Sequence, residues 1–222
     1  MSDETALKPY DVETSVAAGR DEVWEAVTQP PVIKQWFGWD YDGLDAEIRQ
    51  IFVGEATLLA PERMGWADGS FLEVTGDDDR STVRAVRGEP PAADVERFDP
   101  IEEGWRAFLI QLRYLLEEAP KGLRRTLHLT GTSTGRQALG LATGDWTRVG
   151  SRVAWVVDAD GHLVVVSGRL PLVSPDAARI EIIVSTFGID DATFDAYRQT
   201  WSRRWAPLAR GAAVTFHLGA GR

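Results

Sequence analysis

The stretch that decides the fold is DPIEEGWRAFLIQLRYLLEEAP, residues 99–120. Its beginning is typical of a helix N-terminus: Asp99 suits the N-cap, Pro100 fits the first helical position, and Glu102 follows as in a capping box. Apolar residues then recur at the spacing of one helix face, at Trp105, Phe108, Leu109, Leu112 and Leu116. The pattern predicts a long amphipathic helix that must pack against an apolar partner.

Strand and helix signals precede this helix. An alternating pattern predicts a strand over 10–16, and Asp21 and Glu22 suit the first turn of a helix that carries Trp24. Pro30 and Pro31 break that helix. The further elements expected are a short helix over 31–37, an ambiguous helical segment over 44–52, and strands over 57–59, 71–75 and 82–87, the last two as a hairpin.

The second half repeats this order of elements. The expected pieces are a strand around 126–130, a loop over 131–136, strands over 153–157, 163–170 and 179–186, and a helix that follows Asp190 and carries an aromatic stripe. Strands closed by a long helix therefore occur twice, which is compatible with a diverged duplication or with one merged sheet. The predicted architecture is α+β, with helices on one face of an antiparallel sheet.

Charge divides the chain at residues 120–122. Residues 1–120 carry 11 basic and 26 acidic side chains, and residues 121–222 carry 13 basic and 8 acidic ones. We predict two units, 1–120 and 121–222, with the boundary at Pro120-Lys121-Gly122. The opposite signs indicate either two halves that pack on each other or a drift of surface charge.

Composition excludes several classes of function. A formal net charge of −10 argues against nucleic-acid binding, and the absence of cysteine excludes disulfides and thiolate metal sites. No apolar run is long enough to span a membrane, and Met1 to Glu13 lacks the pattern of a signal peptide. We expect a soluble, cytoplasmic protein.

The polar motifs specify no reaction. His128 lies on the polar side of its strand and is interpreted as a surface or hydrogen-bonded residue. The run 77–79 reads as a solvated turn, and 131–136 lacks the Lys-Ser/Thr ending of a phosphate loop. The sequence predicts no catalytic residue, no cofactor and no metal ligand.

The nine tryptophans indicate either a large core or an aromatic cavity. Trp36, Phe37 and Trp39 could line a cavity under the helix that carries Trp105 and Phe108, because concave binding sites favour aromatic walls. The alternative for each of them is ordinary core packing.

Several short motifs, in this order, resemble the SRPBCC superfamily. They are residues 9–16, the run EVWEAVT at 22–28, the proline-rich break, WFG at 36–38, and EGW at 103–105 with Leu112 and Leu115-Leu116. The resemblance covers about Pro9 to Ala119 and is closest to the branch of the heat-shock ATPase activator homologue. It implies a helix-grip fold, in which a curved antiparallel sheet wraps around a long helix and encloses an apolar cavity.

The resemblance implies three functions. The favoured one is binding of a small hydrophobic or lipid-like ligand, without defined catalysis. The alternatives are a cyclase or dehydratase that uses the same cavity, which predicts an ionisable side chain with a shifted pKa in the pocket, and a chaperone-associated module. The sequence is also compatible with a homodimer. The residues predicted to bind the ligand are Trp24, Trp36, Phe37, Trp39, Phe71, Trp105, Phe108 and Leu112.

Overall fold

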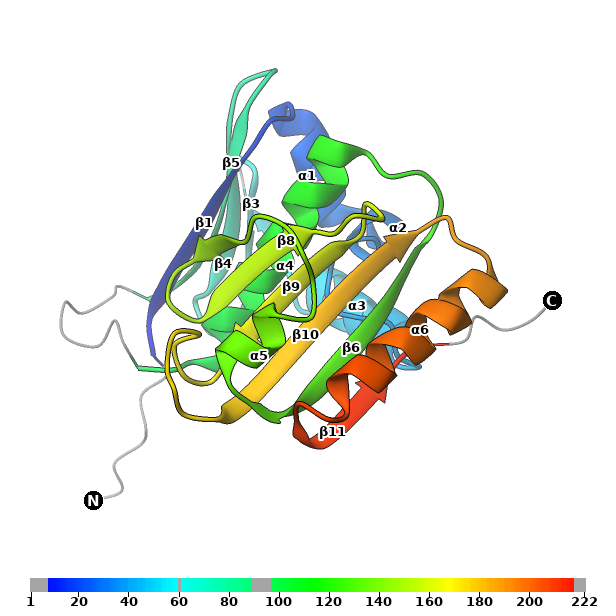
Figure 1. Cartoon of the computed structure of the whole chain (residues 1–222). Helices are drawn as coiled ribbons and strands as arrows, with labels where there is room; N and C mark the ends of the chain where they lie inside the picture. The colour runs from blue at the N-terminus through cyan, green and yellow to red at the C-terminus, as the bar shows by residue number, and fades with distance from the viewer. Residues whose placement is uncertain (1–7, 60, 89–96, 218–222) are drawn as a thin grey trace.

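Two antiparallel sheets lie on either side of one long helix. The computed structural model describes residues 8–59, 61–88 and 97–217 (Figure 1). The first sheet has the strand order β1-β5-β4-β3-β2. Its strands are β1 (Tyr10–Val16), β2 (Thr57–Leu59), β3 (Arg63–Gly65), β4 (Phe71–Gly76) and β5 (Ser81–Arg87).

The second half of the chain forms a sheet of its own and does not extend the first. Its order is β11-β6-β10-β9-β8-β7, again antiparallel throughout. The strands are β6 (Arg124–Ser133), β7 (Thr147–Val149), β8 (Val153–Val157), β9 (Leu163–Gly168), β10 (Ala178–Phe187) and β11 (Arg210–Thr215). The α+β prediction with antiparallel sheets is therefore confirmed.

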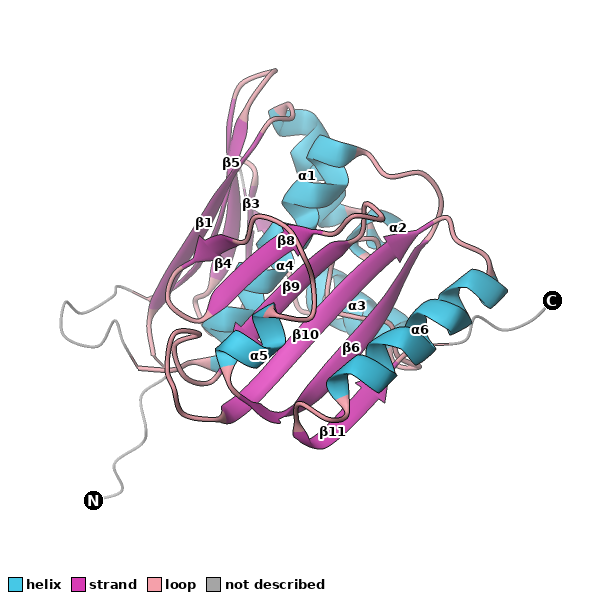
Figure 2. Cartoon of the chain, viewed as in Figure 1, coloured by secondary structure: helices cyan, strands magenta, loops and turns pink. Residues whose placement is uncertain are grey.

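Helix α4 (Pro100–Glu118) packs against both sheets (Figure 2). The face expected from the sequence, which includes Trp105 and Leu112, joins the core of the first sheet with Val12 of β1. Another face joins Val165 of the second sheet through three residues that the predicted stripe omits, Ala107, Ile110 and Tyr114. A helix covered on both sides is why so few of its side chains reach solvent.

Helix α6 (Asp191–Trp205) covers the opposite face of the second sheet (Figure 1). Phe194, Trp201 and Trp205 are buried there against apolar residues of β6 and β10 such as Leu129 and Ile182. This sheet is thus covered on both faces, whereas the sequence pattern predicted helices on one face only. The expectation was wrong because the strands β8, β9 and β10 are apolar on both sides, and each side needs a cover.

The short helices of the first half differ in part from prediction. Helix α1 (Arg20–Thr28) agrees, but α2 (Pro30–Ile33) ends three residues before Trp36. The ambiguous segment forms α3 (Leu44–Arg49) followed by a π-helix over Gln50–Gly54. Trp36 and Phe37 are therefore buried from a turn, where tertiary packing outweighs helical spacing.

Four short elements were not predicted from the sequence. These are β3, β7, β11 and α5 (Gly135–Leu139). The loop expected over 131–136 is instead the end of β6 and the start of α5, which Thr134 caps together with Gln137. Strands of three residues are too short to show alternation, so pairing with a neighbour decides them.

Ala119 ends helix α4 in the left-handed conformation, with φ at 42°. Glycine adopts this conformation without the steric cost that a Cβ imposes. We expect Ala119→Gly to raise the free energy of unfolding by about 0.5–1 kcal/mol, as measured by urea denaturation. An equal or lower stability for the variant would contradict this prediction.

Within the described residues, no helix combines the length and the apolar character that crossing a membrane requires. Residues 1–7 of the N-terminal stretch that was examined for a signal peptide lie outside the described residues.

Candidate functional site

Five of the predicted ligand-binding residues lie together where α4 packs on the core of the first half. Phe37 is the centre of this aromatic cluster: its ring centroid lies 4.7 Å from that of Phe108 and 5.9 Å from that of Trp36. Trp105 lies 6.3 Å from Phe108, and Leu112 is fully buried in the same core. The rings contact one another, and the cavities described below are lined by other residues.

The other three predicted residues lie elsewhere. Trp24 is half-buried at the edge of this core. Phe71 is half-buried beneath the guanidinium of Arg63, 4.3 Å from its ring centroid. Trp39 points to the second sheet and stacks on His128. The structure therefore does not bring all eight residues to one place.

Two aromatic residues that belong to the cluster were missed. Phe52 lies 5.0 Å from Phe37, and Trp66 lies 6.2 Å from both Phe52 and Trp105. The indole of Trp66 donates a hydrogen bond to the carbonyl of Ile51. Phe52 belongs to the segment 44–52, whose helical spacing did not link it to the cavity, and Trp66 lies in a turn, where the sequence shows no regular spacing.

A polar stripe runs along the second sheet on the face that carries α4. Residues that face each other across β6 and β10 share one side of the sheet, and His128 pairs with Ile183 while Thr130 pairs with Glu181. Thr126 pairs with Ser185 in the same register. The stripe consists of Thr126, His128, Thr130, Glu181 and Ser185, of which all but Glu181 are buried. A polar row inside a protein needs partners, and it marks this face as chemically distinct from the apolar face under α6.

His128 and Glu181 form a pair within this stripe. Nε2 of His128 lies 3.4 Å from Oε2 of the diagonally placed Glu181. The indole of Trp39 covers the imidazole, with 3.8 Å between ring centroids and an interplanar angle of 20°. The hydrogen bond with His128 lowers the pKa of Glu181 below its ordinary value and outweighs the opposing effect of burial. His128 is thus hydrogen-bonded, one of the two interpretations drawn from the sequence.

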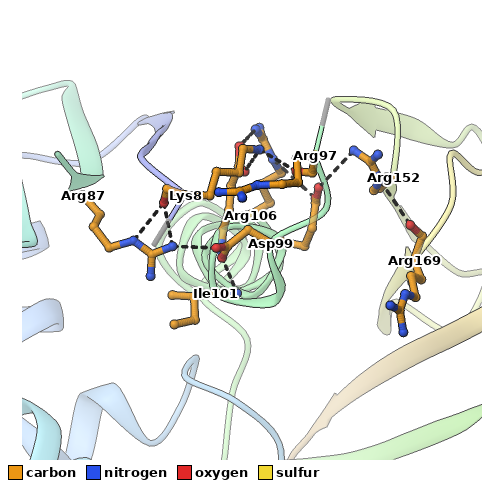
Figure 3. A network of polar contacts seen from close by, with 10 residues as sticks. Lys8, Arg87, Arg97, Asp99, Ile101, Arg106, Arg152 and Arg169 are labelled. Atoms are coloured by element: carbon orange, nitrogen blue, oxygen red, sulfur yellow. Dashed lines mark hydrogen bonds and ion pairs between the residues drawn. The ribbon is translucent and has the colours of Figure 1, made fainter. Parts of the chain in front are cut away.

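A second carboxyl group, Glu103, lies in the first turn of α4. Figure 3 shows the polar network around this helix end, with Asp99, Arg106 and Arg152 among its members. Nε of Arg106 lies 3.4 Å from Oε2 of Glu103, yet within the described part of the chain that oxygen makes no hydrogen bond. Glu103 is only 8% exposed, and burial raises its pKa above the ordinary value while Arg106 acts in the opposite direction.

Glu103 and Glu181 line the same cavity, which has a volume of about 240 Å³. It lies where the beginning of α4 meets the end of β9 and the beginning of β10. Its walls are formed by Phe98, Pro100, Glu103, Ser167, Gly168, Arg169, Arg179 and Glu181. One carboxyl group with a raised pKa and one with a lowered pKa in a single cavity can serve as proton donor and proton acceptor.

Arg124 connects the polar stripe to the first half of the chain through hydrogen bonds. Its guanidinium is buried and donates hydrogen bonds to neutral oxygens: Lys34 O, Phe37 O, Gly38 O, Gln111 Oε1 and Ser185 Oγ. Burial lowers the pKa of Arg124 to about 10, so the group stays charged at neutral pH. A loop, α4 and β10 thus share one cation.

The sequence contains a pattern that indicates the burial of Glu103. Residues 103, 107, 110 and 114 recur at the spacing of a helix face, and the structure buries all four. A carboxyl group on a second buried face is a candidate for a shifted pKa. Glu181 carried no such signal, because it was one polar residue in a mostly apolar strand.

Comparisons with known proteins were made by sequence and by structure. No protein-family model and no curated protein matches the chain. Among solved structures, it is similar to DynU16, a protein of the dynemicin biosynthetic locus, with 17% identity, a TM-score of 0.34, and coverage of 89% of this chain and 95% of that one. The di-domain ARO/CYC BexL from the BE-7585A biosynthetic pathway has 11% identity, a TM-score of 0.33, and coverage of 91% and 96%. The di-domain ARO/CYC StfQ from the steffimycin biosynthetic pathway has 10% identity, a TM-score of 0.33, and coverage of 90% and 98%.

The preference for a protein without catalysis is not borne out by the names of these structures, which describe those proteins and not this chain. Two of the similar structures are named as ARO/CYC proteins of biosynthetic pathways. The cyclase alternative expected an ionisable group in the aromatic cavity; Glu103 and Glu181, whose pKa values are shifted, line a different cavity. None of the three structures is named as a chaperone ATPase activator, and that branch stays a prediction.

Proposed function

We propose that the protein is an acid–base enzyme of the cyclase or dehydratase kind, which acts on a small organic molecule. The observation that carries the proposal is that Glu103 and Glu181 line one cavity while their pKa values are shifted in opposite directions. In such a pair, the carboxyl group with the raised pKa can donate a proton and the carboxylate with the lowered pKa can accept one.

The two carboxyl groups take different roles in a dehydration. Glu181 accepts the proton from a carbon next to a carbonyl, and the contact with His128, 3.4 Å away, holds the carboxylate in place. Glu103, protonated, donates its proton to the departing hydroxyl, which leaves as water while the carbon–carbon double bond forms. In a ring closure, Glu103 would donate instead to the carbonyl oxygen that the new carbanion attacks.

Two arginines suit the charge that develops on the substrate. Arg169 and Arg179 line the cavity with the carboxyl groups, and Nε of Arg179 lies 3.5 Å from Glu181. A cation near the carbonyl oxygen stabilises the enolate that proton removal creates. The substrate's apolar part would lie against Phe98, which the guanidinium of Arg169 overlies at 5.8 Å.

The eight aromatic and apolar residues named from the sequence stay a prediction as ligand contacts. Because the rings of Trp36, Phe37 and Phe108 contact one another, a ligand among them would have to displace side chains. The two-unit division at residue 120 likewise stays a proposal.

Turnover of a substrate panel tests the proposed function. Purified protein is incubated with β-hydroxy ketones and with linear di- and triketones, and mass spectrometry follows loss of one water per molecule or ring closure. We expect acceleration of at least one member over the uncatalysed reaction. If the protein accelerates none and nuclear magnetic resonance detects no binding of any member, the proposal is wrong.

The pH dependence of stability tests the environment of Glu103 without a substrate. Since its pKa is raised above the ordinary 4.5, the folded state binds more protons than the unfolded state as pH rises through that window. The carboxyl group therefore favours the folded state less and less with rising pH. We expect Glu103→Gln to remove this decline in urea titrations from pH 4 to 8, and an unchanged slope would contradict the assignment.

A further inference from the structure

A second cavity lies on the opposite side of the second sheet, beside α6. It has a volume of about 440 Å³ and is separate from the cavity that holds Glu103. One wall is the β8–β9 turn with Asp158, Ala159 and Asp160, and the other is α6. The residues that line it from α6 are Thr193, Ala196, Tyr197, Thr200, Trp201 and Arg204, and Leu141, Ala142 and Thr143 close it.

The carboxylate of Asp158 is held rigidly in this cavity. Oδ1 accepts hydrogen bonds from the backbone amides of Asp160 and His162, at 3.0 and 2.9 Å. Oδ2 accepts one from the hydroxyl of Tyr197, and burial and this hydrogen bond raise the pKa of that tyrosine. A fixed acceptor loses little conformational entropy when a ligand binds.

The polar groups of the two walls have opposite charge. Asp158 and Asp160 are acceptors on the turn, and Arg204 is a donor on the helix. Three threonine hydroxyls lie in the lining with them. Thr200 donates to Ala196 O at 3.0 Å and its oxygen accepts from Arg203 at 3.5 Å, which leaves one further lone pair of the hydroxyl for a ligand. A hydroxyl group both donates and accepts, so a ligand with several hydroxyls can pair with every one of these groups.

The charges and the aromatic rings of the lining further restrict the chemical class of the ligand. A simple cation would face Arg204, and a simple anion would face two carboxylates, so each meets repulsion on one wall. The rings of Tyr197 and Trp201, 6.1 Å apart, add an aromatic surface that suits the C–H face of a ring.

We propose that this cavity binds a neutral polyhydroxylated molecule, a sugar or a cyclic polyol. The site does not depend on the proposed acid–base chemistry, because it lies on the other face of the sheet and shares no residue with that cavity.

Saturation-transfer difference NMR on the full chain tests the proposal. The probes are methyl α-glucoside and myo-inositol, with trimethylamine, acetate and glycine as the cationic, anionic and zwitterionic comparisons. We expect transfer to at least one of the two hydroxylated probes and at least tenfold weaker binding of it by Thr200→Val and by Asp160→Ala. Thr147→Val and Asp176→Ala, exposed residues outside the cavity, serve as matched controls and should bind as the parent does.

Three outcomes would overturn the proposal. The first is that neither hydroxylated probe receives saturation transfer. The second is that the Thr200 and Asp160 variants leave the transfer unchanged. The third is that glycine, trimethylamine or acetate binds more strongly than the hydroxylated probes and that the two variants abolish this binding. Circular dichroism of each variant confirms that a loss of binding reflects the cavity and not unfolding.

Discussion

Replacing Arg124 with methionine is expected to lower the free energy of unfolding by about 3–5 kcal/mol, because a buried hub of hydrogen bonds is lost. The guanidinium is the common donor to carbonyl oxygens of residues 34, 37 and 38 and to the side chains of Gln111 and Ser185. Methionine fills much of the volume but donates nothing, so several buried oxygens lose their partner at once.

The size of the effect follows from what Arg124 joins. Its acceptors come from the loop after α2, from α4 and from β10, three segments far apart in the sequence. Removing the cation also removes the desolvation cost that lowers its pKa to about 10, so part of the lost hydrogen bonding is offset. We expect the loss of hydrogen bonds to outweigh this gain.

Thermal and urea denaturation measure the change. At about 2–4 °C per kcal/mol for a chain of this size, the midpoint should fall by about 10 °C. Arg113→Met is the control, because that half-buried arginine of α4, whose side chain is 43% exposed, makes an ion pair with Glu117 and should cost less than about 1 kcal/mol. Arg124→Lys should lose most of the same stability, since an ammonium cannot reach five acceptors. A loss below about 1 kcal/mol for Arg124→Met would contradict the assignment.

Glu103→Gln and Glu181→Gln are each expected to lower kcat/KM by about 10²–10⁴, given a substrate identified from the panel. Glutamine keeps the shape of the side chain but can neither donate nor accept the transferred proton. Glu103→Gln removes the proton donor, and Glu181→Gln removes the acceptor and its hydrogen bond to His128. The double variant should be little worse than either single one, because one proton transfer without the other does not complete the reaction.

The pH profile distinguishes catalysis from a structural effect. Activity should fall at low pH as Glu181 takes up a proton and at high pH as Glu103 loses its proton, which gives a bell-shaped curve. Glu103→Gln should abolish the high-pH limb of the residual activity. Glu118→Gln, at the exposed end of the same helix, is the control and should leave the profile unchanged. Wild-type activity in either active-site variant would show that its carboxyl group has no catalytic role.

Helix α4 illustrates how far local sequence information reaches. The helix observed over Pro100–Glu118 was predicted from the cap at Asp99, the proline at position 100 and the apolar stripe. The side chain of Asp99 accepts hydrogen bonds from the backbone amides of Ile101 and Glu102, as an N-cap residue does. The second buried face, with Glu103 and Tyr114, was not recognised because the first face already accounted for one packing partner. A single apolar stripe in the sequence does not predict that a helix packs against two sheets.

The candidate site shows the opposite limit. Glu103 and Glu181 are 78 positions apart, and neither has a neighbour in the sequence that suggests proton transfer. His128 and Trp39 carried separate interpretations, one as a polar strand residue and one as part of a cavity wall, yet the two rings stack. Only the packing of α4 and the loop at Trp39 on the second sheet brings these groups together.

The sequence by itself determined the α+β class, the long helices and most of the longer strands, because periodicity and capping depend on residues within a few positions of one another. Only the tertiary structure decided that the second half forms its own sheet, that α4 lies between the two sheets, and that a pair of carboxyl groups shares a cavity. The physical reason is that a pKa shift depends on burial and on the nearest charges, and both are set by residues brought together from distant parts of the chain.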